Sequence, residues 1–192
     1  MAQLILPAGE QTDVSDEALM LRYQRGERDA FVTLLRRHQV AVYNFVLRQL
    51  GSALSADEVA QDVFLGVVRE AARFDYETPF VTRLFSIAQR LVREERTRLP
   101  GRRRRQLSSP PPISKPDSHP QLLEDAICSA IASLPEEQRD VYLLREVADL
   151  PFSEIAAVTR QSENAVKVQL QHALQHLRLA LQDFEEYRRA LR

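Results

Sequence analysis

Cysteine, lysine and long apolar runs are scarce in this sequence of 192 residues. Its one cysteine, Cys128, allows neither an internal disulfide nor a cysteine-based zinc cluster, and we expect it to be a small buried side chain. No apolar run approaches the roughly 20 residues of a membrane-spanning helix, so we expect no direct membrane insertion. The first residues, MAQLILPAGEQ, lack the basic region of a signal peptide. Together these absences predict a cytoplasmic protein.

Motifs of catalysis are absent as well. The sequence contains no Walker loop and no GxGxxG, HExxH or GxSxG segment. His172 and His176 lie one turn apart on a predicted helix, but two imidazoles without a third ligand make a poor metal site. His38 falls among apolar residues, where a core histidine with a polar partner is expected. The sequence therefore predicts no enzyme activity, no cofactor and no metal.

Opposite charges nearly balance, with 26 Lys and Arg residues against 27 Asp and Glu residues. The net charge therefore does not indicate a nucleic-acid-binding protein, but the distribution of charge does. Residues 83–105 contain nine Arg against Glu94 and Glu95, a local excess of seven positive charges. A segment of this charge density is a candidate binding site for nucleic-acid phosphates.

Apolar residues recur at helical spacing through most of the chain, and no alternating strand pattern or solenoid repeat persists. The sequence predicts an all-α fold with two small helical domains. The first, residues 13–99, contains four helices with short connections. Its first three helices are expected to start at Asp16, at Asp29 and at a capping-box pair, and Pro79 fits the first turn of the fourth. The capping-box pair is Ser55 and Glu58.

Two surfaces of this first domain carry residues that its core does not need. The third helix buries one apolar stripe, and its other face presents Asp57, Gln61, Asp62 and Leu65. A short loop, FDYET at residues 74–78, places Phe74 and Tyr76 directly before the fourth helix. Phe74 continues the apolar stripe and could simply close the core, whereas Tyr76 joins no stripe. The exposed side of the fourth helix carries Arg83, Arg90, Arg93 and Thr97.

Residues 100–120 contain six prolines and almost no large apolar side chain. Such a segment cannot form a core, so it predicts a Pro/Arg-rich linker. The second helical domain spans residues 121–184 and contains another capping-box pair, Ser133 and Glu136. A flexible tail is expected at residues 1–12, and a charged tail at residues 185–192.

The second domain ends in two helices joined by a tight turn, at residues 152–178. The first is expected to start at Ser153, and Ser162 is suited to cap the second. Apolar residues of the second helix form one buried stripe. Its start and its other face carry the residues that would reach base edges in a helix-turn-helix: Ser162, Glu163, Asn164, Lys167, Val168 and Gln171. An ordinary helical hairpin with a solvated polar face is the alternative.

Five segments, in this order, carry a resemblance to a known family. They are DEALMLRYQRGERDAFVTLLRRHQVAVYNFVLRQLG from residue 16, DEVAQDVF at 57–64, RFDYETPFVTRLFSIAQRLVREERTR at 73–98, LPEEQRDVYLLREVADLPFSEIA at 134–156 and SENAVKVQLQHALQHLR at 162–178. The chain resembles the bacterial sigma factors of RNA polymerase, in the extracytoplasmic-function (ECF) group of the sigma-70 family. The resemblance implies a promoter-specificity subunit that binds core RNA polymerase, directs it to promoter DNA and assists melting of the −10 element.

The resemblance also implies a role for each candidate surface. The exposed face of the third helix would dock on the coiled coil of the polymerase clamp. The FDYET loop and the fourth helix would recognise and open the −10 element, and the helix from Ser162 would read the −35 element. The linker would run toward the RNA exit path. Members of the family commonly have an anti-sigma factor as a further partner.

Some residues depart from the family pattern. Arg83 and Arg90 stand where the family usually has Trp and Asn, and Gln169 and His172 stand where its recognition helix usually has Arg. Residues 153–178 have a net charge of only +1. We therefore expect the second domain alone to bind DNA weakly, with polymerase adding avidity across two tethered contacts. The alternatives are a sigma-like helix-turn-helix regulator and a polymerase adaptor that does not itself initiate transcription.

Overall fold

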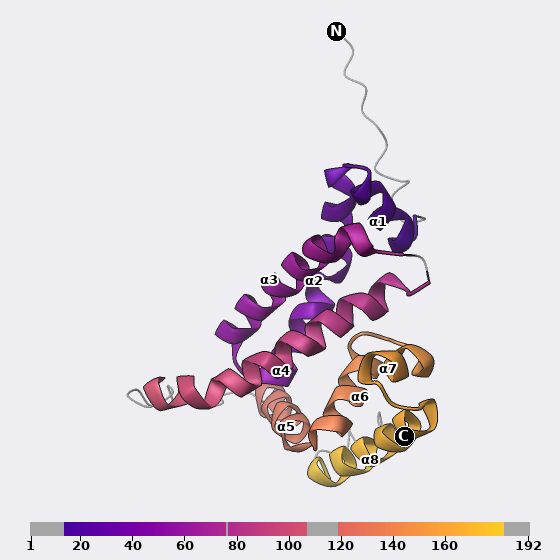
Figure 1. The fold of residues 1–192 in the computed structure, drawn as a ribbon. Coiled ribbons are helices and arrows are strands. Elements are labelled where there is room, and N and C mark those ends of the chain that lie inside the picture. Colours follow the sequence, from indigo (N-terminus) through magenta and orange to yellow (C-terminus); the bar gives the residue numbers. More distant parts are fainter. Residues whose placement is uncertain (1–13, 76, 107–118, 183–192) are drawn as a thin grey trace.

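Helices make up almost all of the computed structural model in Figure 1, which describes residues 14–75, 77–106 and 119–182. Within these residues the regular structure consists of eight α-helices and one short 3-10 helix, without a strand. The predicted all-α class is therefore confirmed. The expected tails at residues 1–12 and 185–192 lie outside the described residues.

The first half of the chain encloses a core between four helices and a 3-10 turn: α1 (Asp16–Gln24), α2 (Arg28–Leu50), α3 (Ala53–Glu70), η1 (Ala71–Arg73) and α4 (Phe80–Gln106). Helix α3 packs against both α2 and α4. The rings of Phe45 and Phe85 meet edge to face, with their centroids 5.3 Å apart, and both are buried. Burial of one such side chain stabilises the fold by about 1.5–3 kcal/mol. This core fixes the directions in which the outer faces of α2, α3 and α4 point.

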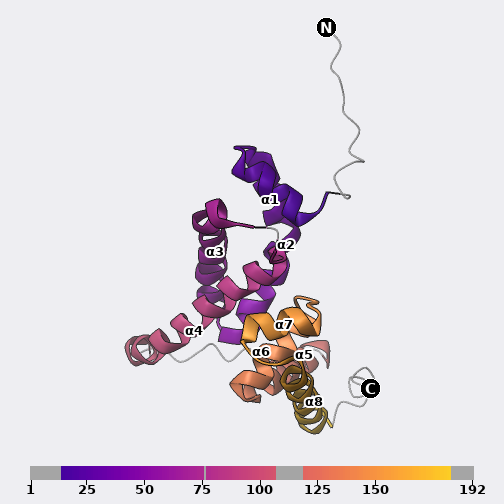
Figure 2. The same cartoon turned by 45° about the vertical axis from the view of Figure 1, so that its right-hand side comes forward.

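Four further helices form the second half (Figure 2): α5 (His119–Ser133), α6 (Glu136–Glu146), α7 (Phe152–Thr159) and α8 (Glu163–Ala180). Helix α6 packs against α7 and α8, and α5 packs against α8. Leu143, Ile155 and Leu177 contribute one buried side chain each from α6, α7 and α8. The predicted helix-turn-helix is thus held on the rest of the second half by an apolar core.

Two of the predicted helix starts in the first half are wrong by a residue or more. Ser15, not Asp16, caps α1, and its hydroxyl accepts a hydrogen bond from the Ala18 N–H at 3.2 Å. Helix α2 begins after Glu27 without a side-chain cap, so Asp29 lies inside its first turn. An acidic residue stabilises the first turn through the helix dipole as well as through capping. The two aspartates therefore lie in the first turns of their helices, but neither is the N-cap.

Both predicted capping boxes are also wrong. Ser52, not Ser55, caps α3 and accepts a hydrogen bond from the Ser55 N–H. Ser133 belongs to α5, where its hydroxyl donates to the Ala130 carbonyl at 2.7 Å, and α6 begins after Pro135 without a side-chain cap. A serine inside a helix can bond the carbonyl of the preceding turn, so the sequence spacing alone did not identify the cap.

The turn of the helix-turn-helix agrees better with its prediction. Helix α7 begins after Pro151 instead of at a Ser153 cap. Arg160 ends α7 in the left-handed conformation, with φ 58°, which reverses the chain direction. The Ser162 hydroxyl accepts a hydrogen bond from the Ala165 N–H at 3.2 Å, which confirms the predicted cap of α8.

The segment expected as a linker is partly helical. Helix α4 continues through Pro100 to Gln106, and α5 begins at His119. A proline removes one backbone donor from a helix, and the arginines that follow it are good helix formers. The rest of the expected linker, residues 107–118, lies outside the described residues. The division of the chain into domains at residues 99 and 121 remains a prediction.

The two halves of the described chain pack against each other, with the second half along α4 in Figures 1 and 2. Helix α4 contacts α7, and α2 contacts α5 and α6. One hydrogen bond across this seam joins the Thr82 hydroxyl to the Glu154 carboxylate at 2.6 Å. One side of α4 therefore faces the second half, not solvent.

Candidate functional site

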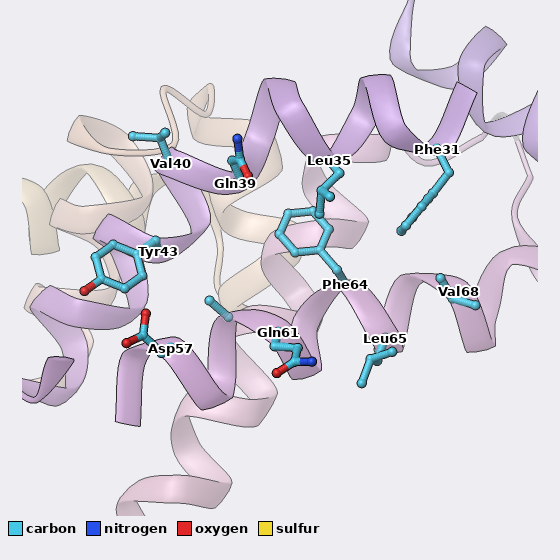
Figure 3. A pocket seen from close by; sticks show the side chains of 11 residues that line it. Phe31, Leu35, Gln39, Val40, Tyr43, Asp57, Gln61, Phe64, Leu65 and Val68 are labelled. Atoms are coloured by element: carbon cyan, nitrogen blue, oxygen red, sulfur yellow. The ribbon is translucent and has the colours of Figure 1, made fainter. Parts of the chain in front are cut away.

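An apolar groove of about 530 Å³ lies between α2 and α3 (Figure 3). Tyr43 and Asp57 lie at one of its ends, and Phe31 and Val68 at the other. The residues that line it are Phe31, Leu35, Gln39, Val40, Tyr43, Asp57, Ala60, Gln61, Phe64, Leu65 and Val68. Most of them are apolar, and Asp57, Gln39 and Gln61 add polar groups that could bond the rim of a protein partner.

Three of the four residues predicted to bind polymerase line this groove: Asp57, Gln61 and Leu65. The fourth, Asp62, is exposed on α3 outside the lining. The sequence pattern predicts a contact face on α3 alone, whereas the groove also includes residues of α2. The sequence does contain a pattern that points to α2, because residues 31, 35, 39 and 43 are spaced four apart and form a second face of that helix.

Apolar side chains stay open to solvent along the groove. Val40 is 63% exposed, Leu65 is 41% exposed and Val68 is 38% exposed. An exposed apolar surface rimmed by polar residues is typical of a protein–protein contact. The core of α2 and α3 does not use these side chains, since it packs toward α4 through other residues.

The FDYET loop is anchored by Phe74, which is 7% exposed. The Phe74 ring packs edge-on against Phe80, with centroids 6.2 Å apart, and the Arg83 guanidinium lies 5.1 Å from its centroid. Phe74 therefore closes the core, as its place on the apolar stripe predicts. Tyr76, the other aromatic residue of the loop, lies outside the described residues.

The basic residues of α4 have acidic partners within the chain. Arg83 pairs with Asp75 at 3.1 Å, and Arg90 pairs with Glu70 at 3.3 Å. Thr97 is exposed, and its hydroxyl donates to the Glu94 carbonyl at 2.6 Å. Each of these ion pairs is partly exposed, so a DNA phosphate can compete for the same arginine.

Arg93 differs from the other arginines of this face because it reaches across the seam. Its guanidinium lies 3.0 Å from the Asp140 carboxylate and 3.7 Å from the Glu136 carboxylate, both on α6. A cleft of about 520 Å³ opens next to it, between α4 and the C-terminal end of α7, and Arg83, Arg90, Arg93 and Arg160 are among the residues that line it. The three predicted −10 arginines of α4 thus line one cleft, which the second half partly covers, whereas Thr97 lies outside its lining.

All six residues predicted to read the −35 element lie together on an exposed face of α8 and its cap: Ser162, Glu163, Asn164, Lys167, Val168 and Gln171. Val166, Ala173 and Leu177 are buried on the opposite face. The Lys167 ammonium lies 5.6 Å from the centroid of the Phe152 ring on α7. This cation–π contact brings the only basic residue of the face to the side nearest α7.

His38 joins α2 to α1. The His38 Nε2 atom lies 2.6 Å from Asp16 Oδ2, and the Arg37 guanidinium donates to Asp16 Oδ1 at 2.7 Å. Burial opposes ionisation of Asp16, but hydrogen bonds from His38 and Arg37, aided by their charges, hold its pKa below the ordinary value. His38 is therefore the partnered histidine that the sequence predicted.

Two further predictions concern Cys128 and metal binding. Cys128 is exposed on α5, so the expectation that it would be buried is wrong: the apolar stripe of α5 passes beside it. His172 and His176 are exposed, and in the described parts of the chain no three His, Cys, Asp or Glu side chains converge as a metal site. No helix among the described residues is both long and apolar enough to span a membrane.

The chain matches two protein families. Residues 34–102 match Sigma-70 region 2, and residues 124–177 match Sigma-70, region 4. The ECF RNA polymerase sigma factor RpoE of Cereibacter sphaeroides is 31% identical over 181 residues, covering 88% of this chain and 97% of that protein. The ECF RNA polymerase sigma-E factor of Escherichia coli is 30% identical over 162 residues, covering 76% and 83%. The RNA polymerase sigma factor CarQ of Myxococcus xanthus is 27% identical over 169 residues, covering 86% and 97%.

Solved structures give the same match. CnrH, in a complex with the cytosolic domain of CnrY, superposes with a TM-score of 0.70 at 25% identity, covering 88% of this chain and 98% of CnrH. The sigma factor RpoE of Bartonella quintana, in a complex with the anti-sigma factor NepR, has a TM-score of 0.61 at 18% identity, which indicates a shared fold.

Proposed function

This chain belongs to the sigma-70 family of RNA polymerase sigma factors, in the ECF group, and we propose that its α2–α3 groove docks the polymerase while α4 and α8 contact promoter DNA. As a sigma factor it binds core RNA polymerase, directs it to promoters and assists melting of the −10 element. It is a transcription initiation factor, and we propose that it performs no bond chemistry itself and acts in the cytoplasm, where the polymerase is.

The groove is the observation that carries the docking proposal. Asp57, Gln61 and Leu65 lie on its lining beside exposed apolar side chains. A polymerase helix laid along the groove would bury Val40, Leu65 and Val68, and its basic or amide side chains would meet Asp57 and Gln61. This is the helix-in-groove mode of recognition. Asp62 lies beside the groove and would contribute at the rim.

The two DNA contacts are proposed from exposure and charge. On α8, Asn164, Lys167 and Gln171 offer donors and acceptors to base edges, and Val168, 47% exposed, can contact a thymine methyl group. On α4, Arg83, Arg90, Arg93 and Thr97 would hold the backbone of the −10 strand. We assign shelter of an unstacked base to Tyr76, because Phe74 is occupied in the core.

An anti-sigma factor is a further proposed partner. CnrH and the Bartonella quintana RpoE were each solved with a bound partner protein. The seam between the two halves and the α2–α3 groove are the surfaces on which such an antagonist would compete with polymerase and DNA.

Run-off transcription tests the proposal directly. Core polymerase is incubated with genomic fragments, with and without this chain, and we expect discrete transcripts only when the chain is present. If the chain binds polymerase but supports no transcript, it is an adaptor. If it protects DNA as a dimer without polymerase, it is an independent regulator. The ion pairs that occupy the α4 arginines are the observation that favours the adaptor as the second candidate.

A further inference from the structure

The Asp140 side chain lies at the seam between the two halves, with 2% of the residue exposed. Asp140 belongs to α6, but the three donors to its carboxylate come from the first half. The Gln49 amide of α2 lies at 2.8 Å, the Gln89 amide of α4 at 2.5 Å and the Arg93 guanidinium at 3.0 Å. Among the described residues, the side chains that donate hydrogen bonds to this buried carboxylate of the second half thus come from the first half.

Other acidic residues of the second half repeat this pattern along α4. Glu136, one turn before Asp140, pairs with Arg96 at 3.2 Å. Glu154 of α7 accepts the Thr82 hydroxyl hydrogen bond at 2.6 Å. The donors at positions 82, 89, 93 and 96 are three, four or seven residues apart, so they lie along one face of α4. An acidic surface of the second half therefore covers a donor-rich face of α4.

We infer that Asp140 is the central pin of a closed, self-inhibited state of the free chain, in which the second half occupies the α4 face that promoter DNA would use. The carboxylate binds the Arg93 guanidinium as a DNA phosphate would, because both are anions that accept its N–H groups. Arg93 cannot serve both partners with the same donors. The role of α4 in this inference rests on the proposed function, whereas the pin is a property of the chain alone.

Both apolar and polar side chains join the two halves, because their buried apolar residues belong to one continuous cluster. Among the polar groups, the Gln89 Oε1 atom is buried without a hydrogen-bond partner in the described part of the chain. A buried ion pair with an unsatisfied neighbour adds little net stability, since desolvation offsets the attraction. The same contacts are specific, so they define one closed arrangement. A partner that supplies phosphates or a larger apolar surface can displace them.

Distance measurement between spin labels tests the pin. One label is attached to Cys128, the only cysteine of the chain and exposed on α5. The other is attached to an Ala72→Cys substitution at an exposed position of η1, in the first half. The unbound parent should give one narrow distance peak. Asp140→Asn removes the charge and presents an NH₂ group to the donors. In this variant most of the distance distribution should move from that peak to longer distances. Helicity by circular dichroism should not change.

Two further variants separate the pin from general damage. Glu137→Gln removes a charge from the same helix, at a residue whose bond to Gln169 stays inside the second half, and should keep the parent peak. Gln89→Glu places a carboxylate against Asp140 and should open the seam. The double variant Gln89→Glu with Asp140→Asn exchanges amide and carboxylate across the seam and should restore the peak. An unchanged peak in Asp140→Asn and in Gln89→Glu would overturn the inference, as would a failed rescue by the double variant.

Addition of core polymerase and a promoter fragment to the labelled parent tests the competition. The distances between the two labels should shift to the longer values measured for the free Asp140→Asn variant. If the complex forms and the closed peak persists, the covered face of α4 is not a DNA surface in that complex, and self-inhibition is refuted. If the closed peak behaves as expected in the free variants but no transcript forms with any fragment, the pin stands and the proposed initiation function fails.

Discussion

Gly66 lies so close to Ile87 that a Cβ atom on Gly66 would stand 2.8 Å from the Ile87 Cγ2 atom. Gly66 lies in the last third of α3 and Ile87 in the first third of α4, so the two helices pack closely where these residues meet. This close packing of α3 on α4 therefore depends on the absence of a side chain at Gly66.

Gly66→Ala should therefore destabilise the protein. Overpacking costs about 1–3 kcal/mol, and the better helix propensity of alanine returns about 1 kcal/mol, so a net loss of up to about 2 kcal/mol is expected. Chemical denaturation measures it. In an Ile87→Ala background the added methyl group has room, and the same substitution should become neutral or stabilising. A loss of equal size in both backgrounds would show that the Gly66–Ile87 contact is not the cause.

The Asp16 carboxylate should make stability depend on pH. Its pKa in the folded state is lowered, since the hydrogen bonds and charges of His38 and Arg37 outweigh its burial. A lowered folded pKa gives stability that is present above the unfolded value, about 3.9, and is lost as the pH falls through the folded pKa. Asp16→Asn should cost about 1.5–3 kcal/mol at neutral pH, the contribution of hydrogen bonds to a charged group.

Denaturation of parent and Asp16→Asn between neutral pH and pH of about 2 checks this. The two stability curves should converge at the acid end, where Asp16 of the parent is protonated. Asp62→Asn, at an exposed position of α3, serves as the control and should follow the parent throughout. A constant gap between Asp16→Asn and the parent at all pH values would show that packing, not charge, joins α1 to α2.

Local features of the chain could be predicted from sequence, because they depend on residues one or two turns apart. The helices, the buried stripe of α8 and the Ser162 cap are of this kind. Caps failed where two candidates were close together, as with Ser52 and Ser55. There the choice depends on the path of the chain before the helix, which the sequence pattern does not contain.

Contacts between distant residues could not be predicted. Arg93 was assigned to solvent and DNA because its α4 neighbours gave it no apolar stripe, and its partner Asp140 is 47 residues away. For a similar reason, the sequence predicted the α3 side of the groove but not its α2 side. The face of α3 that includes Leu65 could be identified from one helix, whereas its enclosure by Tyr43 and Val40 depends on how α2 packs beside it.

Leu65 should contribute to polymerase binding through the groove. Leu65→Ala removes an apolar side chain that is 41% exposed on the lining and that a bound helix would bury, so we expect affinity for core polymerase to fall by more than about 1 kcal/mol. Leu54→Ala is the matched control, because Leu54 lies on the same helix, is 64% exposed and is not part of the lining. Titration of labelled core polymerase measures both. Equal affinities of the two variants would remove the groove from the docking surface.

Lys167 should carry the electrostatic part of −35 recognition, since it is the only Lys or Arg between Arg160 and Arg178. Its position over the Phe152 ring limits the directions in which the ammonium can point. If Lys167 binds a phosphate, Lys167→Ala should weaken holoenzyme binding to all promoter fragments and lower the slope of log affinity against log salt by about 1. If it binds a base, the loss should be about 1–3 kcal/mol and confined to fragments with one base pair at that position.

Holoenzyme binding to promoter fragments at several salt concentrations distinguishes the two cases. His176→Ala is the control on α8, because His176 is exposed but lies more than two turns beyond Lys167. Lys167→Arg keeps the charge and the ring contact, and should retain binding to phosphate but not the contact with a specific base, whose geometry differs for the two side chains. If Lys167→Ala and His176→Ala both bind like the parent at every salt concentration, this face of α8 does not use its one cation, and −35 recognition would have to rest on neutral contacts from Asn164 and Gln171.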